Sequence, residues 1–121
     1  MKKWICLTLL FLCSISAQSE EKPQIVIGSK PFTEGYVLGE MAALLAESAG
    51  EAKVILKQGF GGTAMVFGAL NSQEIHLYPD YTGTISHAIL KNPKITSHSD
   101  LLKELEKKGL LISRALGFNN T

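Results

Sequence analysis

Three short stretches gather the residues that could bind a ligand: GSKPFTE at 28–34, GFGGT at 59–63 and YPDYTGT at 78–84. Each follows a short apolar run and precedes a segment with helical periodicity. In α/β sheets, ligands bind beyond the carboxyl ends of the strands, where loops lead into helix N-termini. The sequence therefore predicts that one crevice receives all three stretches.

Lys30 is the cation of the first stretch. It precedes Pro31, which restricts the local backbone, and it has no evident partner at helical spacing. One interpretation is a solvated loop lysine. The other is a cation that faces an anionic ligand group beside a helix N-terminus, whose free N–H groups favour negative charge. Both fit the sequence.

The third stretch also has two interpretations. It is either a turn with a capping Asp80 and exposed tyrosines, or a site in which Tyr81 presents its aromatic face to a cation. Such a contact contributes about 0.5–2 kcal/mol, depending on how far the cation is desolvated. Thr82 and Thr84 would add hydroxyl donors.

Other residue types argue against catalysis and against metal binding. GFGGT lacks the lysine and the spacing of a phosphate-binding loop, and it is typical of a tight strand-to-helix turn with Thr63 as N-cap. His76, His87 and His98 have no metal-ligand spacing. No nucleophile, zinc-protease or paired-carboxylate motif is present. We therefore expect no metal, no cofactor and no enzyme activity, with an exported α/β enzyme as the alternative from another class.

The elements that must position these residues alternate between strand and helix. β-branched runs predict the strands, and apolar spacing of three and four residues predicts the helices. We expect strands at 24–29, 53–57, 74–78 and 110–113, and helices at 33–50, 64–70, 82–90 and 100–108. Thr33 should cap the first helix and Leu101, Leu102 and Leu105 should face inward from the last. The fold class is α/β, a mostly parallel sheet flanked by helices.

The N-terminus has the composition of a secretory signal peptide at residues 1–17. Lys2 and Lys3 precede an apolar run that is too short to span a membrane, and small residues follow it. A lipid anchor on Cys13 is the competing interpretation, but Leu12 stands where a small residue is required. Removal of this segment would leave no cysteine. A periplasmic location is therefore expected.

Charge and length restrict the partners and the size. The chain has 12 basic and 11 acidic residues, so loss of Lys2 and Lys3 leaves 10 against 11. A net charge of about −1 gives no reason to expect nucleic acid as a partner. Residues 18–121 suffice for one small domain. Because the chain stops at GFNNT soon after a predicted buried strand, we expect it to be an N-terminal fragment.

Four motifs in order resemble the glycine betaine/choline-binding proteins of osmoprotectant ABC transporters. They are IVIGSKPFTEGYVLGEM, GFGGTAMVFGAL, LYPDYTGT and LGFNNT, and together they cover essentially the whole chain after the signal segment. The resemblance implies a type II periplasmic-binding-protein fold, in which two α/β lobes close on a ligand. On this basis, residues 18–121 are the first lobe, cut at the first crossover.

The resemblance also implies roles for particular residues. Lys30 resembles a residue that meets the ligand carboxylate, Tyr81 a tyrosine of the cage around the quaternary ammonium head, and Thr84 a hydroxyl on the carboxylate side. Asn120 resembles a polar residue at the crossover. A buried cation at Lys30 would repel choline, which lacks a carboxylate, and would stabilise glycine betaine, which has one, so it predicts a preference for betaine-like ligands.

The implied function is uptake of an osmoprotectant. The chain would be the exported solute-binding component that delivers glycine betaine, or a related quaternary ammonium compound, to an ABC permease in the inner membrane. Choline, carnitine, proline betaine and other small zwitterions are alternative ligands. A truncated fragment without function is a further alternative.

Overall fold

The computed structural model describes residues 21–117 and 119 of the 121-residue chain. The expected signal segment at 1–17 and the expected ligand residue Asn120 lie outside this part. Within it, no helix is long and apolar enough to cross a membrane.

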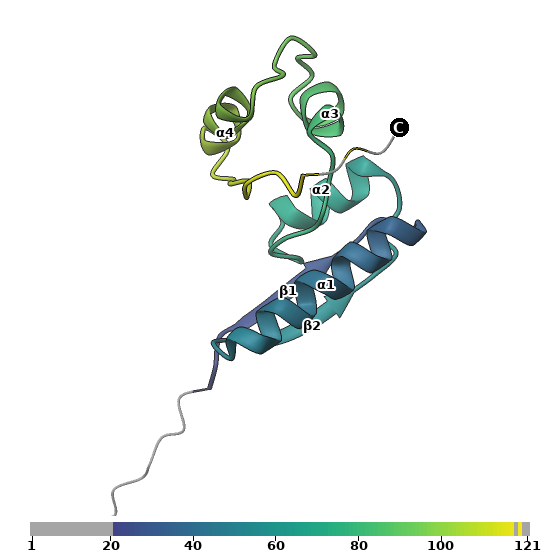
Figure 1. Cartoon of the computed structure of the whole chain (residues 1–121), viewed down its shortest axis with the longest axis vertical. Helices are drawn as coiled ribbons and strands as arrows, with labels where there is room; N and C mark the ends of the chain where they lie inside the picture. Colours follow the sequence, from purple (N-terminus) through teal and green to yellow (C-terminus); the bar gives the residue numbers. More distant parts are fainter. Residues whose placement is uncertain (1–20, 118, 120–121) are drawn as a thin grey trace, which may run out of the picture.

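A parallel pair of strands forms the centre of the fold. β1 (Gln24–Gly28) pairs with β2 (Lys53–Lys57), with Gln24 opposite Lys53, and helix α1 (Thr33–Ala49) connects them (Figure 1). A helical crossover is the usual connection between parallel strands. The mixed α/β fold predicted from the sequence is confirmed.

The third predicted strand is reduced to a single parallel bridge between Ile27 and Leu77. Two hydrogen bonds hold this segment beside β1: the His76 N–H donates to the Val26 carbonyl at 2.7 Å, and the Gly28 N–H to the Leu77 carbonyl at 2.8 Å. The Val26 N–H instead donates to the His76 ring Nδ1 at 2.8 Å. This side-chain bond interrupts the ladder, so residues 74–78 are not a continuous strand.

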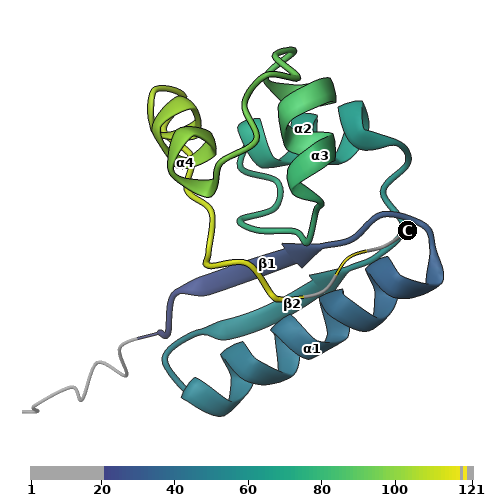
Figure 2. The ribbon, with the colours of Figure 1, turned by 45° about the horizontal axis from the view of Figure 1, so that its top comes forward.

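Helix α1 lies on one face of the sheet, and the other helices lie on the opposite side (Figure 2). The apolar repeat that predicts α1 is not its buried face. Its buried residues are Gly35, Gly39 and Ala43, and Leu38 is partly buried. Four other large apolar side chains are 52–73% exposed. The latter are Val37, Met41, Leu44 and Leu45. The small residues allow the helix to approach the sheet closely. Gly50 ends the helix at φ 70°, as predicted.

Helix α2 (Thr63–Asn71) covers the face of β1 that α1 leaves open, because Val66 and Ala69 pack with Val26 and Ile75 in the main core. Phe60 also packs there. The predicted N-caps of α1 and α2 are each wrong by one residue. The N-caps are Phe32 and Gly62, and Thr33 and Thr63 are already the first helical residues, without side-chain cap bonds.

The helix predicted at 82–90 consists of two parts. A single α-helical turn, α3 (Thr82–Thr84), continues as a π-helix, η1 (Ile85–Ile89), in which the Leu90 N–H donates to the Ile85 carbonyl at 2.8 Å. π-helical turns inside α-helices occur frequently at functional sites. The element was therefore predicted in the right place but with the wrong hydrogen-bond register.

Helix α4 (His98–Glu106) packs on η1 in a second, smaller core. Leu101 and Leu105 are buried there with Ile85, as predicted, and Leu102 is partly exposed. Ser97 is the N-cap and accepts from the Asp100 N–H at 3.1 Å. The strand predicted at 110–113 is not formed. Leu110 and Ile112 pack against this second core instead of pairing with the sheet.

Candidate functional site

The three predicted loop stretches meet at the carboxyl end of the sheet. The Phe60 N–H of the second stretch donates to the Ser29 carbonyl of the first at 2.9 Å. Lys30 of the first stretch reaches Asp80 of the third. Because parallel strands end at the same edge, loops that are far apart in the sequence come together here. The three loops are therefore adjacent, as predicted, whereas their forming one ligand crevice stays a prediction.

Lys30 is a buried ion-pair partner and not a solvated loop lysine. Its Nζ lies 2.7 Å from Asp80 Oδ1, and the two side chains are 10% and 4% exposed. The same Oδ1 accepts the Tyr81 N–H at 2.8 Å. The interpretation of Lys30 as a solvated loop lysine was therefore wrong. Sequence periodicity missed the partner because it comes from another loop.

Tyr78 adds a third group to this carboxylate. Burial, followed by the negative charge of Asp80 and a hydrogen bond to it, raises the pKa of the Tyr78 hydroxyl well above its usual value. Asp80 Oδ1 accepts from Lys30 Nζ and from the Tyr81 N–H, whereas the buried Oδ2 has no hydrogen-bond partner among the described residues. Asp80 is therefore more than a turn residue.

Tyr81 is held by a second contact between the same two loops. Its hydroxyl donates a hydrogen bond to Oε1 of Glu34, in the first turn of α1. Tyr81 is also the N-cap of α3, with extended backbone at φ −90° and ψ 141°. Both side chains are partly buried. The tyrosine ring is therefore fixed at both its backbone and its hydroxyl end.

Thr84, the last residue of α3, is partly buried. Ser29, immediately before Lys30, is fully buried, and its Oγ has no hydrogen-bond partner among the described residues. The structure thus links Lys30 to Tyr81 through Asp80 and places Thr84 one helical turn further. It does not describe the position of Asn120.

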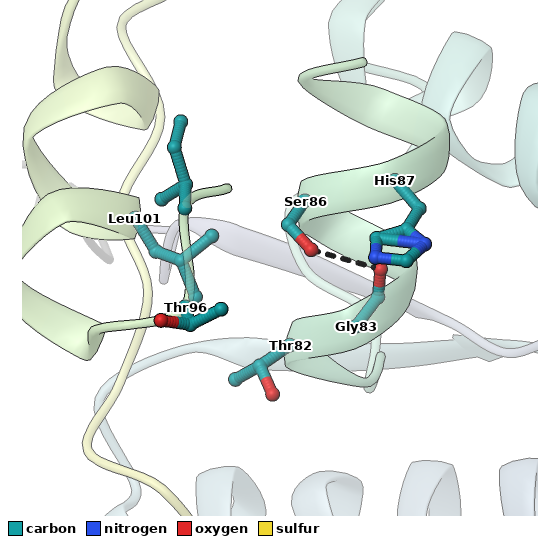
Figure 3. A pocket seen from close by; sticks show the side chains of 7 residues that line it. Thr82, Gly83, Ser86, His87, Thr96 and Leu101 are labelled. Atoms are coloured by element: carbon teal, nitrogen blue, oxygen red, sulfur yellow. Dashed lines mark hydrogen bonds between the residues drawn. The ribbon is translucent and has the colours of Figure 1, made fainter. Parts of the chain in front are cut away.

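A small cavity of about 160 Å³ lies beside α3, between η1 and the segment that leads into α4 (Figure 3). Thr82, Ser86 and Thr96 line it with Leu101, and Ser86 Oγ donates to the Gly83 carbonyl at 3.1 Å. Lys30, Tyr81 and Thr84 do not line this cavity, whereas Thr82, the other threonine expected to offer a hydroxyl, does. It is therefore separate from the Lys30–Asp80 pair.

The histidines contribute to the fold, and no metal site emerges from them. His76 accepts a backbone hydrogen bond in the sheet, His87 lies in η1 and His98 begins α4. Residues 21–117 and 119 contain no group of three or more His, Cys, Asp or Glu side chains that could hold a metal ion. The carboxyl edge of the sheet carries charged and aromatic side chains, which are suited to recognising a small organic ligand.

Comparison with known families shows which family the chain belongs to. Residues 23–121 match the family described as the substrate-binding domain of the ABC-type glycine betaine transport system. The chain belongs to this family. It is a family of transport substrate-binding proteins and not of enzymes, which agrees with the expectation from the sequence.

Curated relatives carry related descriptions. The ergothioneine transport permease/ergothioneine binding protein EgtU of Helicobacter pylori (strain G27) is 41% identical over 109 residues, which are 84% of this chain and 19% of the relative. The glycine betaine-binding protein YehZ of Escherichia coli (strain K12) is 36% identical over 76 residues, 63% of this chain and 25% of that protein. The chain thus spans about a fifth to a quarter of these relatives.

A third relative belongs to a signalling system. It is the chemotactic signal transduction system substrate-binding protein CosB of Halobacterium salinarum (strain ATCC 29341 / DSM 671 / R1). It is 36% identical over 61 residues, 50% of this chain and 18% of that protein. All three descriptions name a binding protein, and the two that name a compound, ergothioneine and glycine betaine, differ in it.

Sequence reasoning missed two residues of the site. Asp80 was considered only as a capping residue of a turn, and Glu34 was given no role in the site. Both contact their partners across 47 to 50 residues of chain. The signal that could have revealed them was the parallel topology itself, which predicts that charged residues after different strands meet.

Proposed function

We propose that this chain is the first lobe of an exported substrate-binding protein that delivers glycine betaine, or a related quaternary ammonium compound, to an ABC permease in the inner membrane. The family match over residues 23–121 carries this proposal. The signal-like residues 1–17 support export to the periplasm. The rest of the cleft would come from a longer gene product. The comparisons support this proposal, because the matched residues are only 19% and 25% of the two relatives.

The proposed cleft binds the ligand through two chemistries. A trimethylammonium head has no N–H donor, so aromatic faces bind it better than hydrogen-bond acceptors do. Tyr81 is the aromatic group for this head, and its fixed position supports the role. Thr84 and Asn120 are proposed as polar groups for the ligand carboxylate.

Lys30 is proposed to assist on the carboxylate side, with a reduced influence on selectivity. An ammonium group has three donors, and Asp80 accepts one of them. The ion pair also offsets the positive charge that a cationic ligand would meet. The repulsion of choline expected from a buried cation is therefore weakened, and choline remains a candidate ligand beside glycine betaine.

A second candidate ligand is ergothioneine. It is favoured by the 41% identity to the ergothioneine-binding relative, which extends over 84% of this chain. Ergothioneine and glycine betaine are both trimethylammonium carboxylates, so the part of the proposed cleft that lies in this lobe could recognise either. Selectivity between the two ligands would depend on protein groups that contact the parts in which the ligands differ.

Calorimetric titration of the complete gene product with glycine betaine, ergothioneine, choline and carnitine tests this function. We expect saturable binding of at least one of them, weakened roughly tenfold or more by Tyr81→Ala through loss of the aromatic contact. Tyr36→Ala, at a more exposed tyrosine of α1, is the control. No binding of any of the four would overturn the proposal.

The first lobe by itself should bind far more weakly than the complete gene product, because part of the proposed cage is missing. Matched titrations of residues 18–121 and of the complete product measure the difference. Equal affinities would show that this lobe suffices.

A further inference from the structure

We propose that Glu34 determines the preference of this site for a cationic head, by positioning Tyr81 and by supplying the uncompensated negative charge of the half-cleft. This inference rests on the proposed function. It starts from the hydrogen bond between the Tyr81 hydroxyl and Glu34 Oε1, a contact between α1 and the loop before α3.

The charges around Tyr81 do not cancel. Lys30 and Asp80 form one buried pair, whose charges offset each other at 2.7 Å. Glu34 is the third charged side chain of the group. Its contact to Tyr81 involves a neutral hydroxyl and leaves its charge in place. Among residues 21–117 and 119, this group of one cation and two carboxylates has a formal charge of −1 next to the aromatic ring.

A carboxylate that accepts from a tyrosine hydroxyl strengthens cation binding in two ways. It polarises the O–H bond toward itself, which raises the electron density of the ring and its attraction for a cation. It also adds a direct Coulomb attraction, which is less screened by salt at a partly buried site than at an open surface. Glu34 is partly buried, so both effects apply.

The position of Glu34 also fixes the ring. The Tyr81 hydroxyl is bonded to Glu34 of α1, and the Tyr81 N–H is bonded to the preceding residue, Asp80. Both ends of Tyr81 are therefore held. An aromatic group that is already in place loses little conformational entropy when a ligand binds. Glu34 is in this respect a positioning residue, acting through Tyr81.

Glu34→Gln in the complete gene product tests the inference. Glutamine keeps a carbonyl acceptor for the Tyr81 hydroxyl and removes the charge. We expect glycine betaine and choline to bind roughly three- to tenfold more weakly, since both present a cationic head. Glu40→Gln on the same helix, where Gln58 Nε2 donates to Glu40 Oε1 at 3.3 Å, is the matched control and should change affinity less than about twofold.

Salt dependence separates charge from structure. The affinity of the unmodified protein should fall as salt rises, and Glu34→Gln should flatten this dependence, which a purely structural role of Glu34 would leave unchanged. Affinities and a salt dependence equal to those of the unmodified protein would overturn the inference. An unmodified protein that binds no quaternary ammonium compound would instead overturn the proposed function.

Tyr81→Phe cuts the same hydrogen bond from the other side and keeps the ring. It serves as the second variant if Glu34→Gln fails to fold. We expect it to weaken choline and glycine betaine binding at least twofold, because the ring loses its hydroxyl anchor. Unchanged affinities in this variant would also contradict the inference.

Discussion

Lys30 and Asp80 stand 50 residues apart in the sequence and form a buried ion pair, with Nζ 2.7 Å from Oδ1. The pair ties the loop after β1 to the loop before α3. It therefore holds together two of the three stretches proposed to bind the ligand. The predictions below test this pair, the tyrosine beside it, and the packing of the elements that carry them.

Lys30→Met should destabilise the chain by about 3–5 kcal/mol, because it leaves the Asp80 carboxylate buried without its countercharge. Urea denaturation monitored by circular dichroism measures the change. The double variant Lys30→Met/Asp80→Leu should recover much of the loss, since no buried charge remains.

The exposed pair of Lys57 and Glu74 is the control for this effect. Their charged atoms lie 3.4 Å apart, with side chains 44% and 53% exposed. Lys57→Met should therefore change stability by less than about 1 kcal/mol. Equal effects at Lys30 and Lys57 would show that burial of the first pair has no energetic consequence.

The raised pKa of the Tyr78 hydroxyl predicts a loss of folding stability at alkaline pH. Its pKa is raised in the folded chain by burial and by Asp80, so the unfolded chain loses this proton first, at about pH 10. Below about pH 10, the contribution of the neutral Tyr78 hydroxyl to the free energy of unfolding is fully present. As pH rises above about 10, the unfolded state binds fewer protons than the folded state, and stability falls.

Thermal unfolding between pH 8 and pH 11 measures this dependence. Tyr78→Phe removes the titrating hydroxyl and should flatten the alkaline decline, although the Asp80 hydrogen bond is lost at every pH. Tyr36→Phe, at a more exposed tyrosine, should leave the slope unchanged. The same slope in Tyr78→Phe as in the unmodified chain would contradict the raised pKa.

Two helical glycines should respond in opposite ways to alanine. A Cβ at Gly68 in α2 meets nothing within 4 Å, so Gly68→Ala should stabilise by about 0.5–1 kcal/mol through helix propensity. A Cβ at Gly35 in α1 would lie 2.9 Å from the Lys30 carbonyl oxygen. Gly35→Ala should destabilise, because the backbone beside the ion pair must shift. Denaturation midpoints of the two variants decide this, and a stabilised Gly35→Ala would refute the close packing.

Leucines on two helices should also differ. Leu101 in α4 is fully buried, and Leu101→Ala should cost about 2–5 kcal/mol. Leu44 in α1 is 63% exposed, and Leu44→Ala should change stability by less than about 0.5 kcal/mol. Free energies of unfolding from urea titration compare them. A large loss at Leu44 would mean that another surface covers this face of α1 in solution.

Much of the secondary structure was predictable because it depends on local sequence. The β-branched runs of β1 and β2 and the apolar spacing of α2 and α4 give the correct elements within two residues at each end. Residues 74–78 and 110–113 were also predicted as strands, but they have fewer β-branched residues and do not form strands. Val26 bonds to the His76 ring, and Leu110 and Ile112 pack on a helix cluster. Such competing contacts are not encoded in the periodicity.

The sequence by itself determined which loops carry the candidate site, because the residue types of Lys30, Tyr81 and Thr84 and their places after apolar runs are visible in it. Only the tertiary structure decided their partners: Asp80 for Lys30 and Glu34 for Tyr81. The physical reason is that the parallel topology brings to one edge loops that are about 50 residues apart. Burial there makes charge pairing obligatory, and local patterns do not record which charges meet.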